Sequence, residues 1–166
     1  MVSEVLNFAR LHDPKQQVEL INECDGNAEV VAEPTLMFRV IYNLVLNAMQ
    51  SMKGQNGRRR VLIEARSDAQ ECTIYVSDNG PGLPHGQAGM LLMPHMSGFG
   101  RPDGTGLGLK IVVDLLNWHG GQIEVARSDS HGTHFKITIP HESKNAPRDD
   151  EIEGVPATLD AVGSEG

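Results

Sequence analysis

The sequence predicts one mixed α/β domain, and three observations carry that prediction. Apolar residues recur at helical spacing in two stretches, which begin near Pro34 and Leu107. Apolar and polar residues alternate in other stretches, most regularly over 133–139, as is typical of strands with one buried face. The chain has 166 residues, a length that suits a single domain and can bury a substantial core.

The composition argues against several classes of function. The formal net charge is −8, which disfavours a general nucleic-acid binder and a protein that binds anionic membranes. No apolar run approaches the roughly 18 residues that a transmembrane helix needs, and the N-terminus lacks the pattern of a signal peptide. We therefore expect a cytoplasmic chain without membrane contact, in which Cys24 and Cys72 are reduced, buried thiols.

Before the first long helix we expect a short helix and two strands. Segment 3–11 has apolar residues at helical spacing, a possible cap at Ser3 and a helix-ending Pro14. Segment 18–21 alternates as a strand does, and 28–31 is predicted as a short edge strand.

The first long helix is predicted to open at Glu33-Pro34, because proline suits a first helical turn. Its predicted core face comprises Leu36, Met37, Val40, Ile41, Leu44, Val45, Ala48 and Met52. Asn43, Asn47 and Gln50 share one stripe of this otherwise apolar helix. Asparagine is a poor helix former, so this stripe indicates either a ligand-binding role or satisfied polar groups at a helix edge.

Hairpins are predicted on both sides of the second helix. Strands over 61–65 and 72–77 flank a turn, and the preceding arginines at 58–60 are interpreted as a solvated loop and strand entry rather than a nucleic-acid contact. The second helix, over 107–119, is expected to stop at Gly120-Gly121. Strands over 123–126 and 133–139 follow, and Pro140 ends the last of them.

Two glycine-rich stretches are candidate ligand contacts. Asp78 ends a strand and precedes Asn-Gly-Pro-Gly-Leu-Pro, so its carboxylate could accept from an exocyclic amine of adenine; a plain turn is the alternative. Gly104-Thr-Gly-Leu-Gly-Leu109 runs into a helix and could cradle phosphate; an ordinary helix start is the alternative. The intervening segment 85–103 is rich in glycine and proline, which favours a lid loop.

Three motifs, in order and spacing, resemble the ATP-binding catalytic domain of bacterial sensor histidine kinases. They are Asn43-Leu-Val-Leu-Asn47-Ala, Asp78-Asn-Gly-Pro-Gly82 and Gly104-Thr-Gly-Leu-Gly-Leu109. Trp118-His-Gly-Gly-Gln-Ile123 and Gly132-Thr-His-Phe-Lys-Ile-Thr-Ile-Pro140 resemble that family's closing hairpin. The resemblance covers about residues 15–140, and the family belongs to a superfamily shared with gyrase B and a heat-shock chaperone.

The resemblance implies a two-layer α/β sandwich of the Bergerat ATP-binding fold, with a mixed sheet, helices on one face and an ATP lid. It implies three regions: 1–14 as the remnant of a preceding dimerisation-domain helix, 15–140 as the ATPase domain, and 141–166 as an acidic disordered tail. The composition of the tail, in which acidic residues outnumber basic ones and no periodicity survives, points the same way.

The resemblance also assigns roles to residues, with ATP and Mg²⁺ as cofactors. Asn47 resembles the family's Mg²⁺ ligand, Asn43 its partner near the phosphates, and Asp78 the acceptor of the adenine amine. Thr133 resembles a threonine that bridges Asp78 to adenine. The implied base turn contains Gly80, Gly82 and Leu83, and the implied phosphate turn contains Gly104, Thr105, Gly106, Leu107 and Gly108.

The implied activity is that of a protein-histidine kinase catalytic domain, which donates the γ-phosphoryl of Mg²⁺-ATP to a histidine. That histidine belongs to a dimerisation domain outside this chain, and a response regulator is an indirect partner. Hydrolytic members of the superfamily have glutamate where this chain has Asn43, and an amide cannot act as a base at neutral pH. Asn43 therefore favours a kinase over a hydrolase.

The sequence departs from the family at two places. His12-Asp13-Pro14 is only a crude echo of the phosphoacceptor motif, because proline directly after the aspartate breaks the helix which that motif needs. The lid has Leu92-Met-Pro-His95 where the family often has Phe-x-Pro-Phe. Two alternatives therefore remain open: a non-catalytic nucleotide-sensing or docking module, and a serine kinase of the anti-sigma-factor type.

Overall fold

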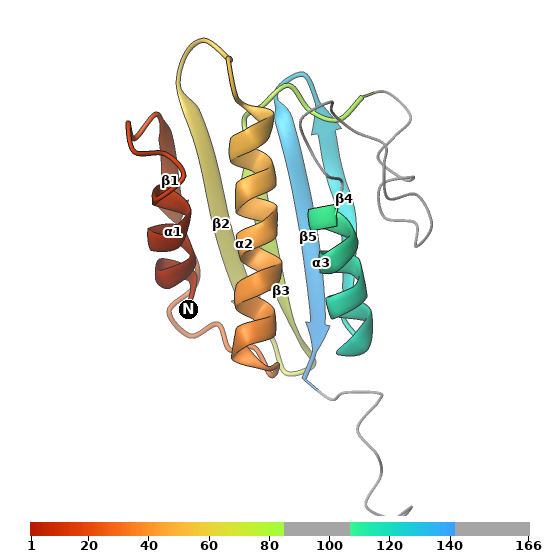
Figure 1. Ribbon diagram of the computed structural model, residues 1–166. Coiled ribbons are helices and arrows are strands. Elements are labelled where there is room, and N and C mark those ends of the chain that lie inside the picture. The colour runs from red at the N-terminus through yellow and green to blue at the C-terminus, as the bar shows by residue number, and fades with distance from the viewer. Residues whose placement is uncertain (85–106, 142–166) are drawn as a thin grey trace, which may run out of the picture.

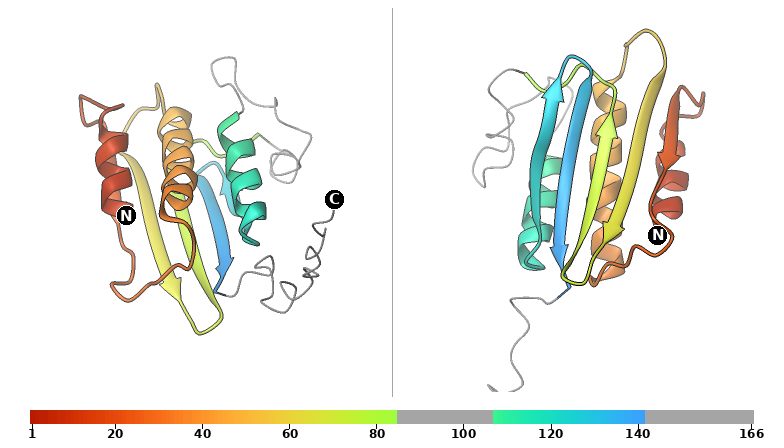
Figure 2. Two further views of the ribbon diagram at one scale, coloured as in Figure 1. Left: turned by 60° about the horizontal axis from the view of Figure 1, so that its bottom comes forward. Right: turned by 180° about the vertical axis from the view of Figure 1, so that it is seen from behind.

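The structure, a computed structural model, describes residues 1–84 and 107–141. Within these ranges a five-stranded sheet is covered by helices on one face, while the view from behind shows the strands in front of the helices (Figures 1 and 2). This two-layer arrangement confirms the predicted α/β sandwich. None of the helices in the described ranges combines the length and the apolarity needed to cross a membrane.

The elements follow the predicted order, with several longer than expected. They are α1 (Val2–Arg10), β1 (Val18–Asn22), α2 (Pro34–Ser51), β2 (Arg59–Ser67), β3 (Glu71–Asp78), α3 (Leu107–Trp118), β4 (Gln122–Asp129) and β5 (Gly132–Pro140). The chain turns sharply after α3 because Gly120 adopts a φ of 69° and the Gly121 N–H donates to the Leu116 carbonyl at 2.8 Å.

Three local predictions are wrong. Segment 28–31 forms no strand, because the Glu29 backbone bonds the Ser67 hydroxyl twice, at 2.7 Å each, instead of a neighbouring strand. Ser3 does not cap α1, whose N-cap is Met1 without a side-chain hydrogen bond. Cys72 is buried as predicted, but Cys24 is only half-buried; both thiols are free.

The order of the strands places the candidate site. It is β1-β2-β3-β5-β4, with β1 and β2 parallel and the other neighbours antiparallel. The register pairs Ser77 of β3 with His134 of β5. The end of β3, at Asp78, therefore lies beside the start of β5, at Gly132 and Thr133.

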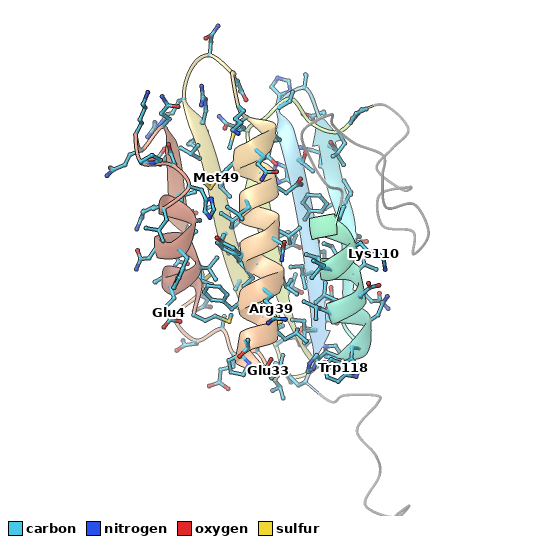
Figure 3. All side chains as sticks on the ribbon, in the orientation of Figure 1. Glu4, Glu33, Arg39, Met49, Lys110 and Trp118 are labelled. Atoms are coloured by element: carbon cyan, nitrogen blue, oxygen red, sulfur yellow. The ribbon has the colours of Figure 1, made fainter. Side chains whose placement is uncertain are left out.

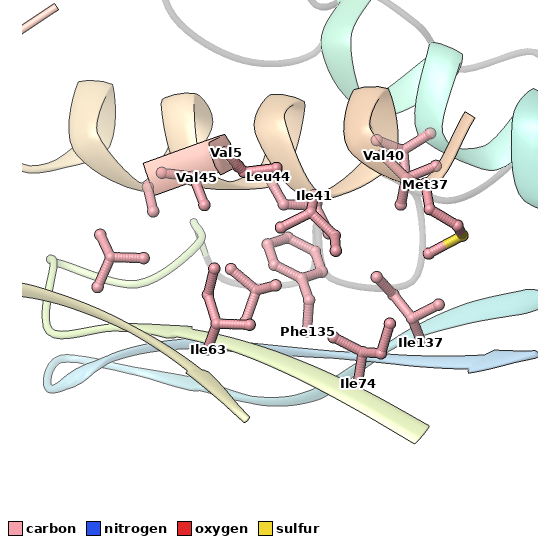
Figure 4. Close-up of a cluster of buried hydrophobic side chains, with 14 of the residues drawn as sticks. Val5, Met37, Val40, Ile41, Leu44, Val45, Ile63, Ile74, Phe135 and Ile137 are labelled. Carbon is pink, nitrogen blue, oxygen red and sulfur yellow. The ribbon is translucent and has the colours of Figure 1, made fainter. Parts of the chain in front are cut away.

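The core lies between α2 and the sheet (Figure 4). All eight residues of the predicted α2 core face are buried, and Met49 joins them. From the sheet, Ile63, Ile74, Phe135 and Ile137 complete the same cluster. Val5, Leu6 and Ala9 of α1 belong to it as well, so α1 packs as part of one structural unit with the sheet. The origin of residues 1–14 in a dimerisation domain stays a prediction.

The carboxylate of Glu33 caps the N-terminus of α2. Its two oxygens accept from the backbone N–H groups of Thr35, at 3.0 Å, and Leu36, at 2.7 Å. The hydrogen bonds from Thr35, and to a smaller extent the hydrogen bond from Leu36, hold the pKa of Glu33 below its ordinary value. The charged carboxylate is thus the form that stabilises the helix.

We expect Glu33→Ala to lower the melting temperature at neutral pH and to lose this effect in acid. A carboxyl whose pKa is lowered by folding stabilises the native state above its ordinary pKa, about 4.3 for glutamate. That stabilisation disappears as the pH falls through the lower, folded-state pKa. Thermal melts of wild type and variant from pH 7 to pH 2 should therefore converge at the acid end. A constant gap across the range would contradict the charge-dependent cap.

Candidate functional site

The centre of the candidate site is Asp78, the last residue of β3. Its side chain is buried, with 8% of its surface exposed. Its Oδ1 accepts a hydrogen bond from the Gly80 N–H at 2.7 Å. A Cβ at Gly80 would lie 2.7 Å from that same oxygen and 2.8 Å from Ser51 Oγ. Glycine at 80 therefore lets the turn fold back tightly onto the carboxylate.

The hairpin between β4 and β5 packs against this turn. Gly132 has a φ of 134°, and a Cβ there would lie 1.8 Å from the Asp78 carbonyl oxygen. Gly82 has a φ of 75°, and a Cβ there would lie 2.1 Å from the Asp129 carbonyl oxygen. The Leu83 N–H donates to Ser128 Oγ at 2.8 Å. The two glycines thus bring the turn into contact with the hairpin.

Thr133 is brought to the site by the same hairpin. Its side chain is 4% exposed, and it follows Gly132, which touches the Asp78 backbone. The predicted association of Thr133 with Asp78 is therefore consistent with the strand register, in which the following residue, His134, pairs with Ser77.

Behind Asp78, a serine–histidine pair joins β3 to β5. Ser77 Oγ lies 3.0 Å from His134 Nδ1, and Arg127 Nη2 lies 2.9 Å from His134 Nε2. Because a guanidinium can only donate, Nε2 must be the acceptor and Nδ1 must carry the proton. His134 then donates to Ser77 rather than taking its proton. The pair therefore links β3 to β5 next to Asp78 and does not form an activated nucleophile.

Asn79 is a structural residue that the sequence analysis passed over. Its Oδ1 accepts from the Arg60 N–H and its Nδ2 donates to the Arg58 carbonyl, both at 2.7 Å. Its own carbonyl accepts from Gln55 Nε2 at 3.0 Å. Asn79 therefore ties the turn after Asp78 to the loop that leads into β2. The sequence did contain one signal for this role: Asn79, directly after Asp78, has an amide side chain that can both donate and accept hydrogen bonds.

We expect Asn79→Ala to lower the free energy of unfolding by about 1–3 kcal/mol, since each lost hydrogen bond contributes about 0.5–1.5 kcal/mol. Urea denaturation measures the change. Asn27→Ala is the matched control: Asn27 is exposed and its side chain bonds no described residue, so the midpoint should hardly move. Equal midpoints for the two variants would exclude the bridging role of Asn79.

Asn43, in the predicted asparagine stripe of α2, faces the first turn of α3. Asn43 Nδ2 donates to the Arg39 carbonyl at 2.7 Å, and a Cβ at Gly108 would lie 3.2 Å from Asn43 Oδ1. Asn43 is therefore satisfied through its nitrogen, while its oxygen points to Gly108. Asn47 lies one turn further on, is half-buried, and has no hydrogen bond to a described residue. Gln50 is exposed.

Part of the predicted site lies outside the described residues. Gly104, Thr105 and Gly106 fall there, as does the predicted lid over 85–103, and the side chain of Leu107 is not described. Among the residues that are described, no group of three or more His, Cys, Asp or Glu side chains could hold a metal ion.

Most of the chain matches the sequence model of one known protein family. The sequence model of the family described as "Histidine kinase-, DNA gyrase B-, and HSP90-like ATPase" matches residues 32–143, which is most of the chain. The chain belongs to this family. The matched range contains Asn43, Asn47, Asp78 and Thr133. Family membership identifies ATP as the ligand class of the domain.

Curated relatives are sensor kinases. The chain is 33% identical over 116 residues to the sensor histidine kinase ZraS of Escherichia coli (strain K12), covering 70% of this chain and 24% of that protein. It is 33% identical over 134 residues to the sensory histidine kinase/phosphatase NtrB of Escherichia coli O157:H7, covering 74% of this chain and 37% of that protein. This ATPase-family chain thus spans well under half the length of these relatives.

Solved structures agree with the fold. The catalytic domain of the histidine kinase ThkA, in a nucleotide-free form, superposes with a TM-score of 0.71 at 26% identity. The superposition covers 84% of this chain and 90% of that one. The mycobacterial sensor histidine kinase MprB, at 22% identity and a TM-score of 0.67, shows the same fold. The chain therefore has the architecture of a histidine kinase catalytic domain.

Proposed function

We propose that this chain binds Mg²⁺-ATP and donates its γ-phosphoryl group to a histidine on a dimerisation domain outside the chain, with a response regulator acting downstream. The observation that carries the proposal is the buried Asp78 carboxylate at the end of β3, held by the Gly80 N–H. A buried carboxylate beside a glycine turn suits a planar amine donor such as the adenine edge. Gly82, Leu83 and Thr133 would complete the base site.

The phosphates would lie at the α2–α3 end of the site. Asn43 Oδ1 and the first turn of α3 at Gly108 are already in near contact there. A helix N-terminus favours anions, and the glycine turn of residues 104–106 leads into it. Asn47 suits the role of a Mg²⁺ ligand because its amide oxygen is a hard donor and accepts no hydrogen bond from a described residue. Bound Mg²⁺ would supply neutralisation of phosphate charge.

The chemistry of Asn43 favours transfer over hydrolysis. An amide has no proton-accepting group at neutral pH, so it cannot activate water against the γ-phosphate. What the chain's residues then contribute is positioning: Asp78 orients the base, and Asn43 and Gly108 flank the phosphate end. Phosphoryl transfer depends mainly on such positioning and on charge stabilisation.

A transfer assay in trans tests this function. The chain is mixed with γ-labelled ATP, Mg²⁺ and a dimerisation domain from a related sensor kinase, and the label is followed to protein. We expect acid-labile label on the histidine of the added domain and none on the chain incubated alone. Acid-stable label on a serine would instead support the serine-kinase alternative. ATP binding without any transfer, to several such domains, would support the non-catalytic module.

A further inference from the structure

A groove lies between the start of α2 and the end of α3, far from Asp78. It encloses about 260 Å³ and is lined by Glu33, Thr35, Leu36, Arg39, Leu115 and Trp118. We name it the α2–α3 groove. Trp118, the single tryptophan of the chain, is 74% exposed at its edge. Figure 3 shows Glu33 and Trp118 at the same end of the two helices.

The groove favours an acidic occupant. Arg39 is exposed and forms no ion pair with any described residue. The Glu33 carboxylate also lines the groove, but the N–H groups of Thr35 and Leu36 at the N-terminus of α2 already engage it, so Arg39 is the charged lining side chain that has no ionic partner among the described residues. Leu115 and Trp118 add apolar surface beside these charges. An acidic segment with interspersed apolar residues complements this combination.

The chain leaves the sheet next to this groove. His141 is anchored at the β2–β3 turn, where its N–H donates to the Gln70 carbonyl at 2.9 Å. The end of α3 lies at the same edge, since a Cβ at Gly121 would lie 3.1 Å from the Thr138 carbonyl oxygen of β5. The end of β5 therefore lies at the end of the molecule where α2 begins and α3 ends (Figure 1).

The sequence that follows has the matching chemistry. Residues 142–166 contain seven acidic and two basic side chains. Within them, Asp149-Asp-Glu-Ile-Glu153 is followed by Val155 and Leu159, so acidic and apolar residues are mixed. Ile152 is eleven positions after His141, and this length of chain can span roughly 36 Å, which exceeds the roughly 27 Å length of α2.

We propose that segment 149–159 of this chain binds its own α2–α3 groove, with Ile152 and Val155 against Leu115 and Trp118 and the acidic residues facing Arg39. This inference does not depend on the proposed kinase function. The groove is at the opposite end of α3 from Gly108, so an occupant there leaves the nucleotide site open. The segment would cover the C-terminal end of α3 and prevent other partners from binding there.

Acrylamide quenching of Trp118 in the full chain tests the inference, because this residue is the only source of tryptophan emission. We expect the double variant Ile152→Asp/Val155→Asp to raise the quenching constant about twofold, as the covered edge of the indole returns to water. Arg39→Glu should raise it similarly, and adding Glu151→Arg and Glu153→Arg to Arg39→Glu should restore protection. Ser164→Asp and Arg66→Glu are controls; Arg66 is 78% exposed and, next to the buried Ala65, lies on the face of the sheet opposite the helices that form the groove.

Two outcomes would overturn the inference. Equal quenching constants for the wild type and the Ile152→Asp/Val155→Asp variant would show that the segment does not cover Trp118. Protection that rises with protein concentration would assign the groove to a second copy of the chain instead. ATP binding, measured on the same variants, should be unchanged, so a failure here is distinguishable from a failure of the proposed function.

Discussion

Asp78→Asn should weaken ATP binding between about tenfold and about a hundredfold, measured by titration calorimetry in the presence of Mg²⁺. A hydrogen bond to a charged group contributes about 1.5–3 kcal/mol, and 1.4 kcal/mol corresponds to a tenfold change in affinity. The amide can still accept from the Gly80 N–H, so the turn should persist while the charged acceptor is lost. The wild type should also prefer ATP to GTP, because guanine presents a carbonyl where adenine presents an amine.

Asp68→Asn is the matched control for this prediction. Asp68 lies in the β2–β3 turn, at the other end of β3, and accepts from the Gln70 and Glu71 N–H groups. The substitution makes the same chemical change far from the candidate site, so its ATP affinity should equal that of wild type. An undiminished affinity of Asp78→Asn would remove the base-recognition role of Asp78.

Gly132→Ala should be the most destabilising of the substitutions considered, at about 2–6 kcal/mol. Overpacking costs about 1–3 kcal/mol, and a strained backbone conformation costs a further 1–3 kcal/mol or so. Both apply here, since φ is 134° and the new Cβ would lie 1.8 Å from the Asp78 carbonyl oxygen. Because that oxygen belongs to Asp78, the folded fraction of the variant should also bind ATP more weakly.

Gly57→Ala separates the two causes. Gly57 has a φ of 93°, but a Cβ there would meet nothing within 4 Å, so only the backbone strain applies. Urea denaturation should therefore show a smaller loss for Gly57→Ala than for Gly132→Ala. Equal losses in the two variants would mean that the contact between the hairpin and Asp78 has no energetic weight.

Local patterns were sufficient to predict the elements of this fold. The apolar spacing after Pro34 predicted α2 and its buried face, because burial of a helix stripe has a fixed period. The alternation over 72–77 placed Asp78 at the end of a strand, and the glycines after it predicted the turn. The position of Thr133 beside Asp78 is different: β5 pairs with β3 across a long stretch of chain, and only the family resemblance anticipated that proximity.

The errors come from contacts that no local pattern contains. Segment 28–31 was predicted as a short edge strand, yet the Ser67 hydroxyl forms hydrogen bonds with the backbone N–H and C=O of Glu29. The bridging role of Asn79 depends on the backbone of Arg58 and Arg60, which only the pairing of β2 with β3 brings near. Such partners are set by tertiary structure, so spacing along the chain does not reveal them.

A crystal structure of this chain with Mg²⁺ and a non-hydrolysable ATP analogue tests the central claim most directly. The account predicts the adenine amine within hydrogen-bonding distance of the Asp78 carboxylate, and the phosphates directed toward Asn43, Asn47 and the first turn of α3. Adenine bound at another surface, or held at this one without contact to Asp78, would contradict the account.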